Sequence, residues 1–487
     1  MNPRRPRQPR SPGWLAALAA LPLAAAAAAA PPPEGQCPAF HGTPTSGVED
    51  AAPRRMARGV PVGYDHLEGL QHLLPEEIWA NRKVFFHPGM RMVIGDCHRR
   101  YPTPAFFAEA TARFAGQATL DADGNLQGYV AGLPFPPEGI DPQARDAGAR
   151  WAWNLAQRFR GAGPVGHFRI VDFASRMGGD MSFEGEFFIL QTSHRADLAA
   201  SDYAEPDAHG NAWVAGGHFD EPTNARHLAW RQMRLDGSLG DGALPDDTFV
   251  YVPTMRKMRR APSAWVDGIY MPRYRTSGDS GGGGLPIGGD STAGPQGAVN
   301  PTAGESIQVT ENLRVGFTAL ALRPNAYVWR VRGEREVLAP LNLAWPGYPL
   351  EKGRNYGPTG LSIASDRWDV RWAVVVDGLP RERTEYEMLT LYIDWQTQQP
   401  LYAITKTRRN RILEVGIPAH RFSDDTLNYP GWPDGEKASV FDPVAEVFYR
   451  VTDDSGWRRE SFDARSTPSE ERLRRRFTSS DYLERGR

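Results

Sequence analysis

The segment 217–221 (GHFDE) carries the residues whose types and spacing are best suited to chemistry. Side chains alternate between the two faces of a strand, so His218 and Asp220 share a face if this segment is extended. A histidine beside a carboxylate can act as a general acid–base pair or hold a metal ion, and His227 follows nearby. A hydrolase that uses His218 and Asp220 is therefore one hypothesis. The alternative is that the segment is a polar loop beside a strand. A histidine and a carboxylate at this spacing more often belong to such a loop than to a catalytic or metal site.

Two other polar groups are weaker candidates for a catalytic site. Ser193 and His194 are neighbours in sequence and cannot form a catalytic triad by themselves. Cys97 stands between Asp96 and His98, but a disulfide bond would remove its thiol from chemistry. The sequence contains no His-Glu-x-x-His motif. We therefore assign no catalytic residue, no metal ligand and no cofactor, and we favour a protein without enzymatic activity.

The first 30 residues have the composition of a signal peptide. Arginines between Arg4 and Arg10 precede an apolar, alanine-rich segment at 14–30, and cleavage is expected near Ala28–Ala30. The mature protein is then expected in the periplasm, either free or peripheral to the outer membrane. The sequence has two cysteines, and an oxidising compartment favours a Cys37–Cys97 disulfide over two free thiols.

Composition divides the rest of the chain into three parts. Residues 31–100 are predicted to form a Pro-rich arm and an irregular amino-terminal segment, 101–460 one domain with a Gly-rich insert at 278–304, and 461–487 a charged tail. The 14 Trp, 16 Tyr and 21 Phe supply ample apolar area for a large core. A formal net charge of −2 gives no general attraction to nucleic acid, so nucleic acid is not an expected partner.

The segments 102–116 and 141–161 are predicted to be helices. Asp141 can cap the second helix, and Gly161 ends it. Its apolar stripe consists of Trp151, Leu155 and Phe159. A stripe of this width is expected to pack against a sheet.

The carboxyl-terminal half has the alternation of an antiparallel meander, with strands expected at 368–377, 388–394, 401–406 and 412–416. One face is predicted to point toward the helices and line any ligand cavity, together with the helical stripe. The residues of that face are Trp372, Val374, Leu389, Leu391 and Ile393. Arg371, Thr390 and Tyr392 lie on the opposite face, which is expected to be the less buried one.

A short strand followed by a basic run forms the most distinctive motif, FVYVPTMRKMRRAP at 249–262. Its basic residues are either a solvated strand edge or a contact for a partner protein. These residues are Arg256, Lys257, Arg259 and Arg260. The motif resembles the signature of an uncharacterised bacterial family of unknown function that is related to the LolA/LolB lipoprotein carriers. The resemblance to this family also includes the segments 128–136 (GYVAGLPFP), 153–161, 323–329 (RPNAYVW) and 391–394 (LYID).

This resemblance implies an α+β fold in which a strongly curved antiparallel half-barrel sheet, as in LolA/LolB, has helices packed on its concave face. It also implies a periplasmic protein that binds or carries a lipid or other lipophilic molecule without chemistry. An accessory subunit of a resistance-nodulation-division type exporter in the inner membrane is the alternative, because family members tend to accompany such exporters.

Overall fold

The computed structural model describes most of the chain that follows the predicted signal peptide. The described residues are 31–41, 56–174, 179–198, 210–221, 223, 225–253, 256–261, 269–270, 273–275, 308–310, 314–315, 322–345, 362–382, 384, 386–429, 431–432, 435–451 and 456–467. The predicted signal peptide, the insert at 278–304 and most of the predicted tail lie outside them. No helix in these ranges is long and apolar enough to cross a membrane.

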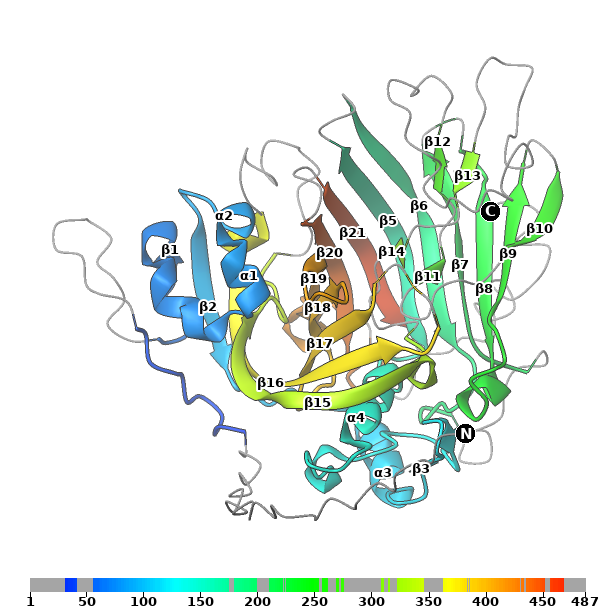
Figure 1. The fold of residues 1–487 in the computed structure, drawn as a ribbon, viewed down its shortest axis with the longest axis horizontal. Helices are drawn as coiled ribbons and strands as arrows, with labels where there is room; N and C mark the ends of the chain where they lie inside the picture. Colours follow the sequence, from blue (N-terminus) through cyan, green and yellow to red (C-terminus); the bar gives the residue numbers. More distant parts are fainter. Residues whose placement is uncertain are drawn as a thin grey trace, which may run out of the picture. The chain divides into compact units, whose positions relative to one another are not determined.

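Fifteen strands of the described residues form one large sheet (Figure 1). They are β1 (Pro61–Gly63), β2 (Arg91–Cys97), β5 (Gly163–Ala174), β6 (Gly179–Gln191), β7 (Asn211–Glu221), β8 (Ala229–Leu235), β9 (Asp247–Val252), β10 (Lys257–Ala261), β15 (Tyr327–Ala339), β16 (Arg367–Pro380), β17 (Met388–Asp394), β18 (Pro400–Lys406), β19 (Ile412–Phe422), β20 (Phe441–Arg450) and β21 (Gly456–Thr467). Their order is β1-β2-β16-β17-β18-β19-β20-β21-β5-β6-β7-β8-β9-β10, and β15 also pairs with β16. Only the β2–β16 pairing among them is parallel. The predicted α+β class and the predicted antiparallel meander are both present.

The remaining elements are short. Two-stranded ladders join β3 (Thr119–Leu120) to β4 (Leu126–Gln127), β11 (Ile269–Tyr270) to β14 (Arg314–Val315), and β12 (Arg273–Arg275) to β13 (Gln308–Thr310). The α-helices are α1 (Glu76–Ala80), α2 (Arg82–Phe85), α3 (Ala105–Arg113) and α4 (Ala147–Ala156). Segments of 3-10 helix occupy Tyr64–Leu73, Pro137–Gly139, Asp236–Leu239, Pro324–Ala326, Ser362–Ser365 and Ser423–Asp425.

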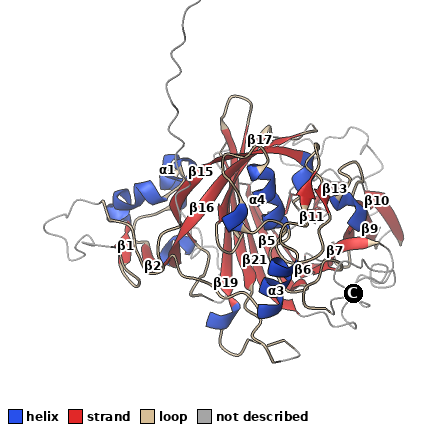
Figure 2. Ribbon diagram, turned by 90° about the horizontal axis from the view of Figure 1, so that it is seen from below, coloured by secondary structure: helices blue, strands red, loops and turns tan. Residues whose placement is uncertain are grey.

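Helix α4 packs on the large sheet, as its apolar stripe predicts, but it is shorter than the predicted 141–161 (Figure 2). It contacts β15 and β16, and the contact is close at Gly148, where an added Cβ atom would lie 2.7 Å from the backbone nitrogen of Arg330. Trp151 and Leu155 are buried in this contact. Phe159 lies beyond the end of the helix and packs instead on Phe106, with ring centroids 5.6 Å apart.

Strands β16 and β17 are buried on both faces, which corrects one prediction from the sequence. Arg371, Thr390 and Tyr392 were expected on the less buried face, yet they are only 2%, 0% and 3% exposed. The polar groups among them are satisfied internally: Thr390 donates a hydrogen bond of 2.7 Å to Asp377, and Arg371 binds Asp394. A second layer therefore covers the face that alternation alone assigned to solvent.

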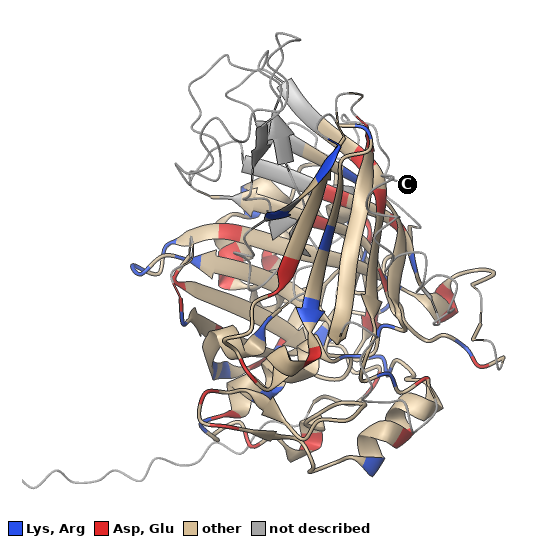
Figure 3. Ribbon diagram, turned by 90° about the vertical axis from the view of Figure 1, so that its right-hand side faces the viewer, with Lys and Arg blue, Asp and Glu red and all other residues tan. Residues whose placement is uncertain are grey.

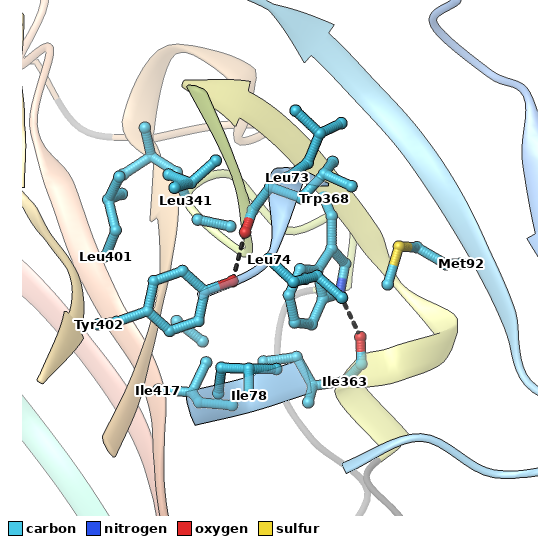
Figure 4. Close-up of a cluster of buried hydrophobic side chains, with 14 of the residues drawn as sticks. Leu73, Leu74, Ile78, Met92, Leu341, Ile363, Trp368, Leu401, Tyr402 and Ile417 are labelled. Carbon is cyan, nitrogen blue, oxygen red and sulfur yellow. Dashed lines mark hydrogen bonds between the residues drawn. The ribbon is translucent and has the colours of Figure 1, made fainter. Parts of the chain in front are cut away.

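The covering layer comes from the amino-terminal segment, which is not the irregular arm predicted for 31–100. Residues from β1 to α2 pack their apolar side chains on the second face of β16–β19. Figure 4 shows Leu73, Leu74, Ile78 and Met92 around Trp368 and Tyr402. The indole of Trp368 donates a hydrogen bond of 2.7 Å to the carbonyl oxygen of Ile363 in the same cluster (Figure 4). The domain also continues beyond its predicted end at 460, because β21 runs to Thr467 and pairs with β5.

Cys37 and Cys97, the pair expected from the sequence, are bonded to each other, with their Cα atoms 5.1 Å apart. Cys97 ends β2, so the bond ties the segment 31–41 to the sheet. Tyr101, just beyond β2, adds a buried hydrogen bond of 2.6 Å to Asp369 of β16. The amino-terminal layer is thus held by covalent, polar and apolar contacts together.

Candidate functional site

One buried cluster holds most of the side chains predicted to line a cavity. The central apolar cluster, as we call it, contains buried side chains of α4, β5–β8 and β16–β18. Of the predicted residues it includes Trp151, Leu155, Val374, Leu389, Leu391 and Ile393. Phe159 belongs to a separate small cluster with α3. Trp372 is half-buried, and its indole donates a hydrogen bond of 3.3 Å to Glu334.

Aromatic rings of neighbouring strands form one wall of the central apolar cluster. Phe219 of β7 lies 5.6 Å from Phe168 of β5 and 5.4 Å from Trp230 of β8, measured between ring centroids. In the same cluster, Phe187 of β6 lies 5.6 Å from Phe462 of β21. This wall combines large apolar area with ring edges and faces that attract one another. Sequence analysis did not identify it.

The predicted cavity is filled by its own side chains. Val374, Leu389, Leu391 and Ile393 are all 0% exposed. None of the predicted cavity residues lines the small cavity described below, the depression beside the Cys37–Cys97 bond, or the depression lined by Arg330, Asp377 and Lys406. The central apolar cluster is therefore a packed layer in this structure.

One group in that layer has an unmet hydrogen bond. The indole nitrogen of Trp230 is buried and has no hydrogen-bond partner among the described residues, and the side chain is 2% exposed. An unsatisfied buried donor is costly, so it calls for a specific explanation. By contrast, the indole of Trp153 reaches the carbonyl oxygen of Gly124 at 3.0 Å.

A small cavity with a cationic lining lies where α4, β6, β8 and the turn before β15 meet. It has a volume of about 20 Å³, which is room for one water molecule. We call it the arginine pocket, because three arginines and one histidine line it without any carboxylate among its described lining residues. That lining comprises Trp153, Ala156, Gln157, Arg160, Gln191, Ser193, His194, Ala212, Trp213, Arg234, Ser238, Leu239, Leu322, Arg323, Pro324 and Asn325.

Arg234 is held in place from behind the pocket. Its Nε and Nη2 atoms donate to the two carboxylate oxygens of Asp246 at 3.0 and 2.9 Å, and Nη1 donates to the carbonyl oxygen of Leu322 at 2.8 Å. Gln232 donates a further hydrogen bond of 3.0 Å to Asp246. The guanidinium also lies 4.7 Å from the ring of Trp213. Both members of this ion pair are buried, so the pair is fixed by its hydrogen bonds.

The other cations of the pocket are held differently. Burial, and then the charge of Arg234, lower the pKa of Arg160 to about 10. Arg323 donates from Nη2 to the carbonyl oxygen of Gly242 at 3.1 Å, and burial lowers its pKa. The Nε2 atom of His194 lies 3.0 Å from a carboxylate oxygen of Asp236. Burial raises the pKa of Asp236, but the hydrogen bonds from His194 and Ser193 and the charge of His194 lower it more. The pKa of Asp236 is therefore below its ordinary value.

The histidine–carboxylate pair singled out from the sequence lies on β7. His218 Nε2 is 3.3 Å from an oxygen of Asp220, so the two side chains share a face as alternation predicts. Asp220 is half-exposed, and His227 lies in the turn between β7 and β8. Within the described part of the chain, no three His, Cys, Asp or Glu side chains gather as a metal ion would require. His218 Nδ1 has no hydrogen-bond partner among the described residues, so none of them orients the imidazole from that side.

The basic run predicted as a partner contact falls on the last strand of the large sheet. Arg256 precedes β10 in a turn, and Lys257 and Arg260 are exposed on the strand. Figure 3 shows the sheet from the side of its last strands, with Lys and Arg in blue. Arg260 forms an ion pair with Asp247 of β9. The side chain of Arg259 lies outside the described residues.

Two of the sequence motifs meet in the arginine pocket. The segment 153–161 supplies Trp153 and Arg160, and the segment 323–329 supplies Arg323 and Asn325. This convergence was the available sequence signal for the pocket. The motif at 391–394 has a structural explanation instead, because Asp394 is buried and accepts hydrogen bonds from Arg371.

Comparison with known proteins finds similarity to a family of unknown function. A model of proteins of unknown function (DUF1329) matches residues 72–278. A DUF1329 family protein from Desulfovibrio piger is 10% identical, with a TM-score of 0.40 over 70% of this chain and 99% of its own. A LolA superfamily protein from Nitrosomonas europaea is 11% identical, with a TM-score of 0.32 over 68% of this chain and 98% of its own. No curated protein matches the chain. Over residues 72–278 the chain is similar to the DUF1329 family of unknown function, which confirms the resemblance expected from its motifs.

Proposed function

We propose that this protein binds a lipid or another lipophilic molecule in the cell envelope and catalyses no reaction on it. In this proposal the large sheet curves around α4 as a half-barrel, and the ligand takes a place in the central apolar cluster. The predicted signal peptide and the disulfide support a periplasmic location.

The observation that carries the proposal is the unmet indole donor of Trp230 in the aromatic wall. A lipophilic ligand has apolar chains that suit the wall and carbonyl oxygens that can accept one hydrogen bond. Such a ligand would satisfy the donor without bringing a charge into the apolar layer.

The energetics favour binding only if the ligand replaces internal contacts at low cost. Burial of an acyl chain yields about 0.8 kcal/mol per methylene, so ten methylenes offer roughly 8 kcal/mol before ordering costs. The cluster is closed, so the binding-competent state is a minor one. Its low population weakens the apparent affinity in proportion. We therefore expect micromolar rather than nanomolar binding.

The test compares two tryptophan-to-phenylalanine variants. Trp230→Phe keeps an aromatic ring in the wall but removes the donor, so it should weaken binding of a fluorescent fatty acid ester. Trp368→Phe makes the same change in the opposite cluster, where the indole already donates to Ile363. It should lower stability but leave binding unchanged.

The wild-type protein gives the decisive control. Native mass spectrometry of protein purified from periplasm, followed by lipid extraction, should reveal a bound lipid. Absence of lipid, together with absence of binding to the fluorescent ester, would contradict the proposal. Equal loss of binding in both variants would show that the wall has no special role.

The basic strand β10 supports a second proposal, that this chain docks to an envelope exporter as an accessory subunit. Met258, between the basic residues, is 41% exposed, so the strand presents apolar and cationic groups together. Reversing the charge at Arg256, Arg259 and Arg260 should then abolish co-purification with the exporter while lipid binding persists. Unchanged co-purification would refute the docking role.

A further inference from the structure

We propose that His194 is held as a doubly protonated imidazolium and forms a proton-dependent latch between the segment 128–136 and the turn at Asp236–Leu239. The proposal goes beyond the proposed function and does not rest on it, because it concerns how two parts of the chain are held together. The observation behind it is that each ring nitrogen of His194 faces an oxygen atom of a group that accepts hydrogen bonds.

The two contacts use both nitrogen atoms of the imidazole. Nδ1 is 2.8 Å from the carbonyl oxygen of Val130, and Nε2 is 3.0 Å from a carboxylate oxygen of Asp236. A carbonyl oxygen and an ionised carboxylate have no hydrogen to donate, so each contact requires an N–H of the ring. A neutral imidazole has only one N–H. Both hydrogen bonds therefore form together only when the ring carries two protons and a positive charge.

The surroundings of Asp236 favour its ionised form. The hydroxyl of Ser193 donates to the same carboxylate oxygen at 2.6 Å, so this oxygen accepts from both neighbours. The pKa of Asp236 is also below its ordinary value, as described above. A protonated Asp236 that donates to a neutral His194 is therefore the less favourable arrangement.

Other groups around the ring act on its charge in both directions. The ring of Tyr129 stacks on that of His194 with centroids 4.6 Å apart, and the face of an aromatic ring attracts a cation. Three guanidinium groups line the same cavity and oppose the charge of the imidazolium. They belong to Arg160, Arg234 and Arg323.

Two nearby cations have carboxylates of their own. Asp246 neutralises Arg234, and Asp197 binds Arg195, the residue that follows His194. For His194 the compensating charge is that of Asp236 in direct contact. Opposite charges at this distance stabilise each other more strongly inside a protein than in water.

The backbone of His194 is left-handed, with φ at 56°, a region that few residues other than glycine adopt. From this position its side chain joins Val130 to Asp236, which begins the 3-10 segment after β8. Each of the two joined segments also supplies a member of the central apolar cluster, Tyr129 from one and Leu239 from the other. The latch therefore ties together two segments that contribute to this cluster.

Loss of one proton breaks one of the two hydrogen bonds. The folded protein with a closed latch holds a proton that the unfolded chain releases more easily. The contribution of the latch to stability is therefore present at lower pH and is lost as the pH rises. We expect the latch to be closed at neutral pH and to weaken as the medium becomes alkaline.

The first measurement detects the two protons directly. Mature protein with ¹⁵N-labelled histidine gives a long-range proton–nitrogen spectrum that distinguishes a doubly protonated ring from either neutral tautomer. At about pH 7, where an ordinary histidine is mainly neutral, His194 should be doubly protonated. His420, whose pKa burial lowers to about 3, should show one unprotonated nitrogen in the same spectrum. The signals of His194 are assigned by their loss in His194→Gln.

The second measurement follows the latched segment. Its amides at Leu133 and Phe135 donate hydrogen bonds to Thr111 and Asn154, so their exchange reports opening of the segment. Exchange in 128–136, corrected for the chemical rate at each pH, should become about tenfold faster in wild type between about pH 6 and pH 9. In His194→Gln it should not change with pH, because glutamine does not titrate.

His218→Gln is the matched control. His218 is also a buried histidine beside a carboxylate, but its partner Asp220 lies on the same strand, so the pair joins no two segments. This variant should keep the pH response of wild type in 128–136. If both variants lose the response, it does not come from the His194 latch, and the inference is overturned.

Two further results would contradict the latch. One is an unprotonated ring nitrogen of His194 at about pH 7, and the other is exchange in 128–136 that does not depend on pH in wild type. If His194→Gln fails to fold, Asp236→Asn replaces it in the first measurement. Removal of the carboxylate charge should leave His194 with one unprotonated nitrogen at the same pH, and unchanged double protonation would refute the role of Asp236.

Discussion

His420 should make the stability of this protein fall as the pH is lowered. The side chain lies on β19, is 6% exposed, and its Nδ1 atom has no hydrogen-bond partner among the described residues. Burial, and then the charge of Arg158, lower its pKa from 6.5 to about 3. The folded protein therefore holds His420 neutral at pH values where the unfolded chain would protonate it.

The sign and size of the effect follow from proton linkage. Because the folded pKa is depressed, the contribution of His420 is fully present above pH 6.5 and is lost as the pH falls from there to about 3. Each unit of difference in pKa corresponds to about 1.4 kcal/mol. The full effect is therefore roughly 5 kcal/mol, and about 2 kcal/mol of it should disappear between about pH 7 and pH 5.

The assay is urea unfolding of the wild-type protein and of His420→Leu at both pH values. Asp369 and Asp442 have pKa values raised to about 6 by burial, so their contributions to stability increase as the pH falls and oppose that of His420. They remain in both proteins and cancel in the comparison. The variant should gain about 2 kcal/mol relative to wild type on going to the lower pH.

Ile417→Val serves as the control. It shortens a buried side chain on the same strand and removes no titratable group. Its cost should be the same at both pH values. If the difference between His420→Leu and wild type is also independent of pH, then His420 is accessible to protons in the folded protein, and the reasoning from its burial is wrong.

Three further predictions concern the contacts that hold the layers together. Glu77→Gln should lower the free energy of unfolding, measured in urea, by roughly 3–5 kcal/mol, because the buried ammonium of Lys406, 2.6 Å from Glu77, then lacks its carboxylate. Adding Lys406→Met should restore most of the lost stability. Replacing Cys37 and Cys97 by serine should cost about 4 kcal/mol, since their bond closes a loop of 60 residues, and unreduced wild-type protein should show no free thiol in a denaturing assay. Gly148→Val should lower the free energy of unfolding by about 1–3 kcal/mol, because α4 rests directly on the β15 backbone at this point; an unchanged melting temperature would show that the helix can move away.

Alternation along the strands was enough to predict which side chains of the meander share a face. Val374, Leu391 and Ile393 do enter one cluster, since the period of a strand is fixed by its covalent geometry. The state of the opposite face could not be predicted in the same way. Arg371 looked like a solvent-facing residue, yet it is buried because Asp394 binds it through two hydrogen bonds of 2.6 and 3.0 Å.

The arginine pocket was not predicted from the sequence for a different reason. Its cations come from segments as far apart as Arg160 and Arg323, and only the fold brings them together. Arginine is also abundant in this chain, so no single arginine stood out. Helix α4 was predicted from its stripe, but the pocket depends on how the chain turns after Ala156, where the stripe gives no information.

The two faces of β16–β18 differ in a way that bears on function. The face toward the amino-terminal layer is closed by the Cys37–Cys97 bond and by the Tyr101–Asp369 hydrogen bond, so opening it would break covalent and buried polar contacts together. The face toward α4 is closed mainly by apolar contacts, which a lipophilic ligand can replace with contacts of the same kind. The central apolar cluster on that side also borders the arginine pocket and contains the unmet donor of Trp230 on β8. Of the two buried layers, the one around α4 is therefore the one whose chemistry suits an amphiphilic guest.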